Sequence, residues 1–315
     1  MADTEDSAPK RKRTFAENMA KARTKNIAAQ ANQAAPAQAA LTVTPAEPQE
    51  VHLPAWPDVV RCVPNGVLRS SLFGAIKKGP RRYIPGEQMA ALDGIEIRYK
   101  GERLDQGDLD VWESLLHVVR FQAIGEQCRL TAYGLLKLMG KTDTGKNRAT
   151  LQTRIERLRA NAVTIKQGRY SYIGGLVDEA FKDEETQEWV IGLNSKLHAL
   201  FADDQFTQID WMVRHALDGK PLAQWLHGFY ASHAKPYPVR VETLLNLAGS
   251  EDASPTSARQ TLRKALDAVA EASIANDQPF SYEILGDLVH VEKKPNGTQR
   301  RHLARKSSQP RKRKP

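Results

Sequence analysis

The sequence has little cysteine, and its metal-binding residue types do not cluster. Cys62 and Cys128 are the only cysteines among 315 residues, and two distant thiols make neither a disulfide framework nor a zinc site. The eight histidines form no His-x-His pair and show no metal-ligand spacing. We therefore expect no metal and no cofactor. We interpret His227 and His233, which lie among aromatic residues, as packing residues.

Long apolar runs are also missing. No run approaches the roughly 18 residues of a membrane-spanning helix. The N-terminus carries charge but lacks the apolar stretch of a signal peptide. We therefore expect a cytoplasmic location.

Acidic residues are missing from one end of the chain. Ten of the 46 Lys and Arg residues lie in Lys293–Pro315, which has no Asp or Glu. The rest of the chain has 36 basic and 37 acidic residues and is nearly neutral. The net charge of +9 is thus concentrated in a basic tail, which we expect to be disordered and to attract phosphates regardless of base sequence. DNA affinity in the folded part must then come from local basic faces.

The first 52 residues contain one aromatic residue, Phe15, amid much Ala, Gln, Pro and charge. Such a segment buries too little apolar surface to offset the entropy of ordering. We predict a disordered tail with a transient helix over Phe15–Gln30. We interpret its basic run Lys10–Arg13 as solvated, with DNA contact as the alternative.

Ordered structure is expected from Leu53 onward, where apolar residues recur with helical or alternating spacing. The expected elements are a helix over Asn65–Ile76, a strand or hairpin over Glu96–Leu104 that turns at Gly101, a helix over Asp108–Ile124, and an apolar helix over Leu130–Met139 capped near Thr131.

The most informative pattern is a basic amphipathic helix followed by β segments, which occurs twice. The first copy begins with the turn Gly140–Gly145. The helix Arg148–Ala162 follows, with the apolar stripe Leu151, Ile155, Leu158 and Ala162. Its strands are Val163–Gln167, Tyr170–Phe181 and Glu188–Leu193.

The second copy begins with the helices Trp211–Ser232 and Val239–Leu247 and the turn Gly249–Pro255. The helix Thr256–Ala272 follows, with the apolar stripe Ala258, Leu262, Ala265, Leu266 and Val269. Its hairpin consists of Phe280–Ile284 and Leu288–Glu292 around Gly286-Asp287.

Two helix–hairpin units predict an α+β protein with two tandem winged-helix domains and disordered N- and C-terminal tails. The expected divisions are 1–52 for the N-terminal tail, 53–205 for the N-terminal winged-helix domain with its leading segment, 206–292 for the C-terminal winged-helix domain, and 293–315 for the basic tail.

Such a chain can hold two neighbouring grooves of one duplex, so we predict a sequence-specific DNA binder. A basic helix face is most often only solvated, but two copies in the same context favour DNA contact. Helical geometry points Thr153 and Arg157, and likewise Gln260 and Lys264, away from the apolar stripes, where they suit phosphate and base-edge contacts. The candidate DNA-binding residues are Lys146, Arg148, Thr153, Arg154, Arg157, Lys166, Arg169, Ser257, Gln260, Arg263, Lys264, Lys293 and Lys294.

Two segments resemble enzyme sites. Gly140–Asn147 nearly matches the phosphate-binding loop G-x-x-x-x-G-K-[ST], but Asn147 replaces the magnesium-binding hydroxyl and a helix precedes the segment instead of a strand. Asp105, Asp108 and Asp110 could serve a two-metal nuclease. Their position at a helix start favours helix capping. We therefore expect no enzymatic activity.

Several longer stretches resemble the TrfA family of plasmid replication initiators. They are Leu53–Asp58, Arg69–Phe73, Gly94–Gln106, Asp108–Trp112, and, late in the chain, Ser232-His233, Pro236–Pro238 and Glu242-Thr243. The resemblance covers about Leu53 to Val291, in order and nearly without gaps.

The resemblance implies a bacterial, DNA-associated protein that binds direct repeats (iterons) in a plasmid origin, promotes opening of adjacent AT-rich DNA, and recruits the host initiator and replicative helicase. It also implies a homodimer in equilibrium with the monomers that bind repeats. Family members can carry a sliding-clamp-binding peptide of Gln-Leu-Ser-Leu-Phe type. The nearest candidate here, Gln38–Val43, lacks the aromatic end, so clamp binding through it is not expected.

A winged-helix transcriptional repressor that binds DNA without melting it is the alternative to an initiator. A nucleotide hydrolase at Gly140–Asn147, or a nuclease at Asp105–Asp110, is the enzymatic alternative.

Overall fold

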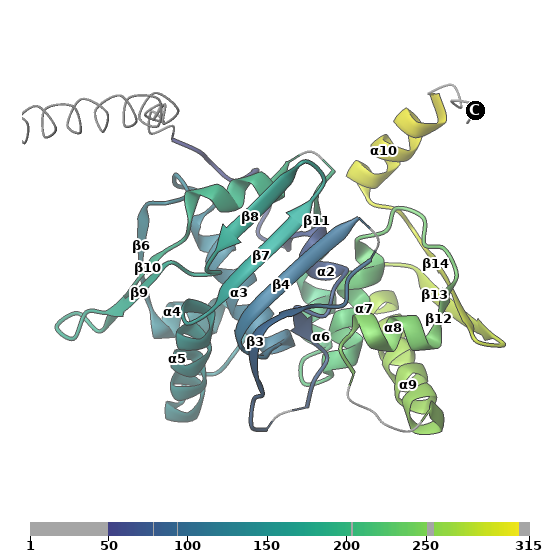
Figure 1. Cartoon of the computed structure of the whole chain (residues 1–315), viewed down its shortest axis with the longest axis horizontal. Coiled ribbons are helices and arrows are strands. Elements are labelled where there is room, and N and C mark those ends of the chain that lie inside the picture. Colours follow the sequence, from purple (N-terminus) through teal and green to yellow (C-terminus); the bar gives the residue numbers. More distant parts are fainter. Residues whose placement is uncertain (1–49, 78, 93, 203, 251–254, 309–315) are drawn as a thin grey trace, which may run out of the picture. The chain divides into compact units, whose positions relative to one another are not determined.

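A computed structural model describes residues 50–77, 79–92, 94–202, 204–250 and 255–308 (Figure 1). Up to residue 210 its elements are β1 (Val60–Pro64), α2 (Asn65–Leu68), β2 (Phe73–Gly74), β3 (Tyr83–Gln88), β4 (Ile95–Glu102), β5 (Leu104–Asp105), α3 (Gln106–Val119), β6 (Gln127–Thr131), α4 (Ala132–Leu138), α5 (Gly145–Arg159), β7 (Ala162–Gln167), β8 (Tyr170–Gly174), β9 (Glu179–Lys182), β10 (Glu188–Gly192), the 3₁₀ helix η1 (Ser195–Phe201) and β11 (Phe206–Asp210). After residue 210 they are α6 (Trp211–Ala216), α7 (Pro221–Ala231), β12 (Val239–Arg240), α8 (Val241–Leu247), α9 (Pro255–Ile274), β13 (Phe280–Leu285), β14 (Leu288–Lys293) and α10 (Gly297–Ser308).

One helix–strand sequence occurs twice in this order. The elements α3, β6, α4, α5, β9 and β10 occur in the same order as α7, β12, α8, α9, β13 and β14, except that β7 and β8 are inserted between α5 and β9. Each set forms a three-stranded antiparallel sheet, with the orders β6-β10-β9 and β12-β14-β13. The first strand of each set therefore pairs with the last. A basic helix with a hairpin after it thus occurs twice, as predicted, whereas the division into two winged-helix domains stays a prediction.

The hairpin of the first copy differs from the prediction. Tyr170–Phe181 was expected to form one strand, but it divides into β8 and β9. The backbone turns inward between them, where Leu176 is fully buried and its carbonyl accepts a hydrogen bond of 2.9 Å from the Trp112 indole. The hairpin in the repeated unit is therefore β9–β10, and β7–β8 belongs to a separate sheet.

That separate sheet has four antiparallel strands in the order β3-β4-β7-β8, drawn as neighbouring arrows in Figure 1. Strand β4 buries Ile97 and Tyr99 on one face. The expected turn at Gly101 is wrong, because Gly101 stays in the ladder opposite Ile84. Its φ of +146° and the Tyr99 hydroxyl, which would lie 2.9 Å from an added Cβ, explain the glycine.

Two other expected helices are shorter than predicted. Only Asn65–Leu68 of the segment Asn65–Ile76 is helical, because Phe73 and Gly74 pair with β5. The expected helix Trp211–Ser232 divides into α6 and α7. Gly219, at φ +76°, and Pro221, at the first position of α7, account for the break.

The buried apolar side chains form two clusters. One runs along the sequence from Leu53 to Ile209 and the other from Val213 to Val291. Arg214, with 1% of its side chain exposed, joins them through ion pairs of 2.8 Å to Asp110 and 2.5 Å to Glu113, both on α3. The cores thus separate close to our predicted division after residue 205, which stays a prediction.

The expected C-terminal disorder is wrong for residues 297–308, which form α10 directly after β14 (Figure 1). The predicted features of the N-terminal tail, including Lys10–Arg13, Phe15–Gln30 and Gln38–Val43, lie outside the described residues. Within the described part, no helix is both long and apolar enough to cross a membrane.

Candidate nucleic-acid interface

Helix α5 forms where the sequence ends the preceding helix, supplies an N-terminal cap and continues with an apolar stripe. Gly140, at φ +67°, follows α4. Thr144 then caps α5, since its hydroxyl accepts a hydrogen bond from the Asn147 amide. Leu151, Ile155 and Leu158 are buried as predicted. Ala162, which we placed on the same stripe, is instead exposed at the start of β7.

The first turns of α5 present an exposed polar face. Lys146, Arg148 and Thr153 are all exposed. The Thr153 hydroxyl donates to the Ala149 carbonyl at 3.0 Å. Arg148 makes a two-pronged ion pair with Asp143, with N–O distances of 2.6 and 2.7 Å. The hydrogen bond from Arg148 holds the pKa of Asp143 below its usual value. This pair orients Arg148 before any ligand arrives.

The segment Gly140–Asn147 connects two helices, α4 and α5, and Thr144 within it serves as a helix cap. The Asn147 side-chain amide donates to the Thr142 carbonyl at 2.8 Å, so this side chain closes the turn. A phosphate-binding loop would instead follow a strand.

Arg157 does not lie on the exposed face, and this part of the prediction is wrong. Its side chain is 10% exposed and forms ion pairs of 2.7 Å to Asp108 and 3.0 Å to Glu102. Arg154 also turns inward, with 20% exposure and Asp105 3.9 Å away. Helical periodicity pointed Arg157 away from the apolar stripe, but it could not show that carboxylates distant in the sequence lie on that side of the helix.

Two of these carboxylates, those of Asp105 and Asp108, cap α3. The Asp105 side chain accepts from the Asp108 amide and the Asp108 side chain accepts from the Asp105 amide, both at 2.9 Å, which makes a reciprocal capping box. Burial, with the negative charge of Asp105, raises the pKa of Asp108 to about 6. Burial opposes ionisation of Asp105 too, but Arg154 and Arg81 outweigh it and hold its pKa below the usual value. The capping interpretation is confirmed for Asp105 and Asp108, whereas Asp110 pairs with Arg214.

Lys166 and Arg169 lie on the four-stranded sheet and not on the hairpin of the repeated unit. Lys166 pairs with Glu96 at 2.6 Å on β4. Arg169 lies in the β7–β8 turn, its guanidinium 4.9 Å from the centre of the Tyr170 ring. The contact of these two residues with DNA stays a prediction.

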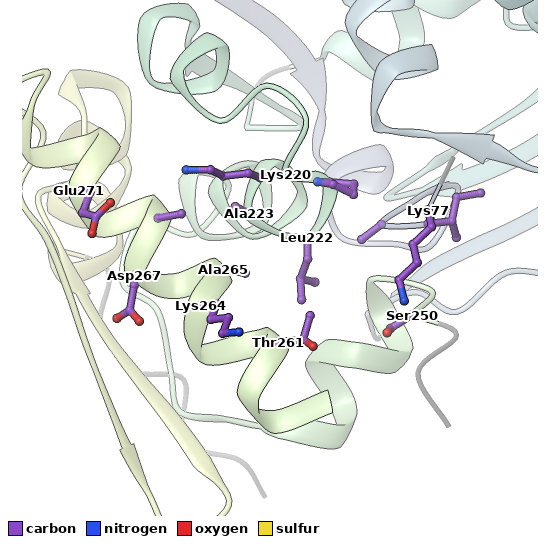
Figure 2. A pocket seen from close by; sticks show the side chains of 14 residues that line it. Lys77, Lys220, Leu222, Ala223, Ser250, Thr261, Lys264, Ala265, Asp267 and Glu271 are labelled. Carbon is purple, nitrogen blue, oxygen red and sulfur yellow. The ribbon is translucent and has the colours of Figure 1, made fainter. Parts of the chain in front are cut away.

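Helix α9 matches its prediction closely. Its five predicted apolar residues are buried, whereas Ser257, Gln260, Arg263 and Lys264 are exposed. Figure 2 shows Lys264 at the edge of a pocket of about 740 Å³ between α9 and the start of α7, whose floor includes Leu222 and Ala265. No side-chain partner of Arg263 or Gln260 is found within the described part of the chain.

Lys293 and Lys294 differ in accessibility. Lys294 is exposed, but Lys293 is half-buried at the end of β14, and its ammonium donates to Gln299 at 3.0 Å. Burial lowers the pKa of Lys293 to about 8. Lys293 therefore supports α10, and it is not the start of a free tail as we expected.

Two features near these residues were not predicted. The β9–β10 turn contains Gln187 at φ +59°, and Arg129 on β6 pairs with Asp183 in that turn at 3.2 Å. Exposed Arg300, Arg301, Arg305 and Lys306 lie on α10. The available signal for α10 was Asn296, three residues before Gln299 and ahead of a run of good helix formers, because the two side chains form a reciprocal capping box with hydrogen bonds of 2.8 and 3.1 Å.

Comparisons of the sequence with known proteins match the chain to one family and to a member of it. The family described as TrfA protein matches residues 11–293. The plasmid replication initiator protein TrfA of Escherichia coli is 25% identical over 249 residues, which are 76% of this chain and 63% of that relative. The chain thus spans less than two thirds of its relative's length.

Two solved structures are similar. Domains 2 and 3 of RctB have a TM-score of 0.51 at 13% identity, covering 74% of this chain and 98% of that one, which shows a shared fold. The Pi initiator protein in complex with iteron DNA has a TM-score of 0.43 at 9% identity, covering 60% and 91%.

Proposed function

This chain belongs to the TrfA family, and from that premise we propose that it is a plasmid replication initiator that binds direct repeats in a plasmid origin. The observation that carries the proposal is the duplicated unit, in which α5 and α9 hold the same place before a three-stranded sheet with the same strand order. One chain then has two equivalent helices with which to contact DNA.

We infer that the two units are winged-helix domains. In this arrangement a recognition helix enters the major groove and the following hairpin contacts backbone or minor groove. The helices would be α5 and α9, and the hairpins β9–β10 and β13–β14. Each helix buries an apolar stripe and exposes a polar face, so it can contact DNA without leaving the core.

The residues proposed to contact DNA change with the structure. On α5 they are Lys146, Arg148 and Thr153, and on α9 they are Ser257, Gln260, Arg263 and Lys264, all of which are exposed. Lys294 remains a candidate for phosphate contact. Arg154 and Arg157 support α3 instead, and Lys293 supports α10.

The proposal extends to events after binding. The protein opens adjacent AT-rich DNA and recruits the host initiator and replicative helicase, without enzymatic activity of its own. Monomers bind the repeats, in equilibrium with a homodimer. These steps rest on the family premise.

The test is replication in trans. A circular DNA that carries only the repeat-containing origin should be maintained when a permissive host supplies this protein, and lost when it does not. Permanganate footprinting of the AT-rich flank distinguishes an initiator from a repressor, because only an initiator makes thymines reactive. Specific binding without reactive thymines or replication would favour the repressor.

A further inference from the structure

A second pocket, separate from the α5 and α9 faces, lies between α10 and the body of the protein. It has a volume of about 650 Å³, within the range of small-molecule sites. Its walls come from α2, β11, the end of α7 and α10. Most of its lining residues are of polar types, and Asp204 is the one acidic residue among those described.

Arg69 brings a half-buried positive charge to this pocket. Its guanidinium donates to the Ser232 hydroxyl at 2.9 Å and to the Ser232 carbonyl, which fixes its direction. Burial lowers the pKa of Arg69, because the charged guanidinium loses part of its hydration there. No carboxylate pairs with it in the part of the chain that the structure describes. Its positive charge is therefore available to an anionic ligand.

Arg301 on α10 adds a second positive charge to the same pocket. Its guanidinium donates a long hydrogen bond of 3.5 Å to the Thr298 hydroxyl. Asp204 does not neutralise it, since that carboxylate lies 3.2 Å from His302 and 3.6 Å from Arg305. Two guanidinium groups without a carboxylate partner among the described residues therefore line one cavity.

Helix α10 is held in place over the cavity. The Gln299 amide donates to the Ala231 carbonyl at 2.6 Å, and its oxygen accepts from Lys293 at 3.0 Å. These contacts fix α10 at its first turn, so Arg301 lines the cavity from an anchored helix. Guanidinium forks match phosphate oxygens in geometry and charge.

We propose that this pocket binds a phosphate-bearing ligand, with Arg69 and Arg301 as its guanidinium contacts. The phosphoryl group is the shared chemistry of two sources, a free nucleotide-like molecule and a DNA backbone. Binding of a small phosphate does not depend on the proposed initiator function.

The test uses the full chain with inorganic pyrophosphate as probe, measured by calorimetry at constant ionic strength. Saturable binding is expected, and Arg301→Gln should weaken it about tenfold through the loss of charge-assisted hydrogen bonds. Arg300→Gln is the matched control, because it removes the same charge one residue away and Arg300 does not line the pocket. Arg69→Lys should also weaken binding, since lysine keeps the charge but loses the fork.

Binding of a duplex with shuffled sequence identifies the source. If the phosphate belongs to DNA, pyrophosphate competes with the duplex, and Arg301→Gln weakens duplex binding more than Arg300→Gln does. If it belongs to a free ligand, the two variants bind the duplex equally and differ only with pyrophosphate. Absence of saturable pyrophosphate binding, or equal weakening in both variants, would overturn the proposal.

Discussion

At the scale of single residues, the arginines of α5 separate into two groups with different tasks. Arg148 and Arg159 are exposed, whereas Arg154 and Arg157 turn toward the carboxylates at the start of α3. An arginine on a basic helix is thus not by itself a DNA contact. Its nearest carboxylate decides what removing it will do.

Arg157→Ala should destabilise the fold. The Asp108 carboxylate, which is fully buried, would lose its 2.7 Å partner, and breaking a buried ion pair costs about 3 kcal/mol. Urea unfolding measures the change. Arg159→Ala on the same helix is the control and should stay within about 0.5 kcal/mol of the parent. Unchanged stability combined with lost preference for repeats would instead return Arg157 to the DNA interface.

His227 should make the stability depend on pH. It is 8% exposed, and burial lowers its pKa to about 3. Below about pH 6.5 the unfolded chain binds a proton there that the folded chain does not, so stability falls by about 1.4 kcal/mol per pH unit. His227→Leu removes this loss. The unfolding free energy of the variant should therefore gain about 2 kcal/mol relative to the parent between pH 7 and pH 5.

Exposed His52 provides the control, and His52→Gln should track the parent across the same pH range. A constant difference between His227→Leu and the parent at all pH values would show that His227 is protonated in the folded state as readily as in the unfolded one.

At the scale of elements, local signals predicted what local contacts determine. Asp105 and Thr131 cap α3 and α4, and Gly286 with Asp287 turns β13 into β14, as expected. Strands β6 and β12 were missed because their partners lie far along the sequence, so no local pattern marks them. The division of β8 from β9 was likewise hidden, because the burial of Leu176 against Trp112 causes it.

Helix α9 carries the sharpest prediction about DNA. Arg263→Ala should weaken binding to repeat DNA by about 1–3 kcal/mol if the Arg263 side chain contacts a base. The affinity of the variant for shuffled DNA should then change less than its affinity for repeat DNA, as measured by fluorescence anisotropy. Arg98→Ala removes an equally exposed arginine from β4 and should leave the preference for repeats unchanged. Equal losses on both DNAs would show that Arg263 contacts only phosphate.

We expect α10 and the residues after it to supply positive charge without recognising bases. Ending the chain after Asn296 leaves β14 complete and removes eight of the ten basic residues that follow Glu292. The slope of log affinity against log salt should become shallower by about one for each phosphate that the shortened chain no longer neutralises. The preference for repeats should remain. If that preference disappears while circular dichroism shows an intact fold, α10 contributes to specificity.

At the scale of the whole molecule, two cores are tied together by a few buried polar contacts. Arg214 on α6 pairs with Asp110 and Glu113 on α3, and the Trp225 indole donates to the Ser70 carbonyl at 3.0 Å. The duplicated pattern of helix and hairpin was visible in the sequence. The contacts between the two cores were not, because they join residues more than 100 positions apart.

The central claim is that one chain recognises tandem repeats with two equivalent helices. A gel-shift titration on repeat-containing origin DNA, against the same DNA shuffled, at about 150 mM salt, tests it most directly. We predict a ladder with one step per repeat, at an affinity about 10³-fold or more above that for shuffled DNA. Equal retardation of the two DNAs would contradict the claim and would mean that the basic tail dominates binding.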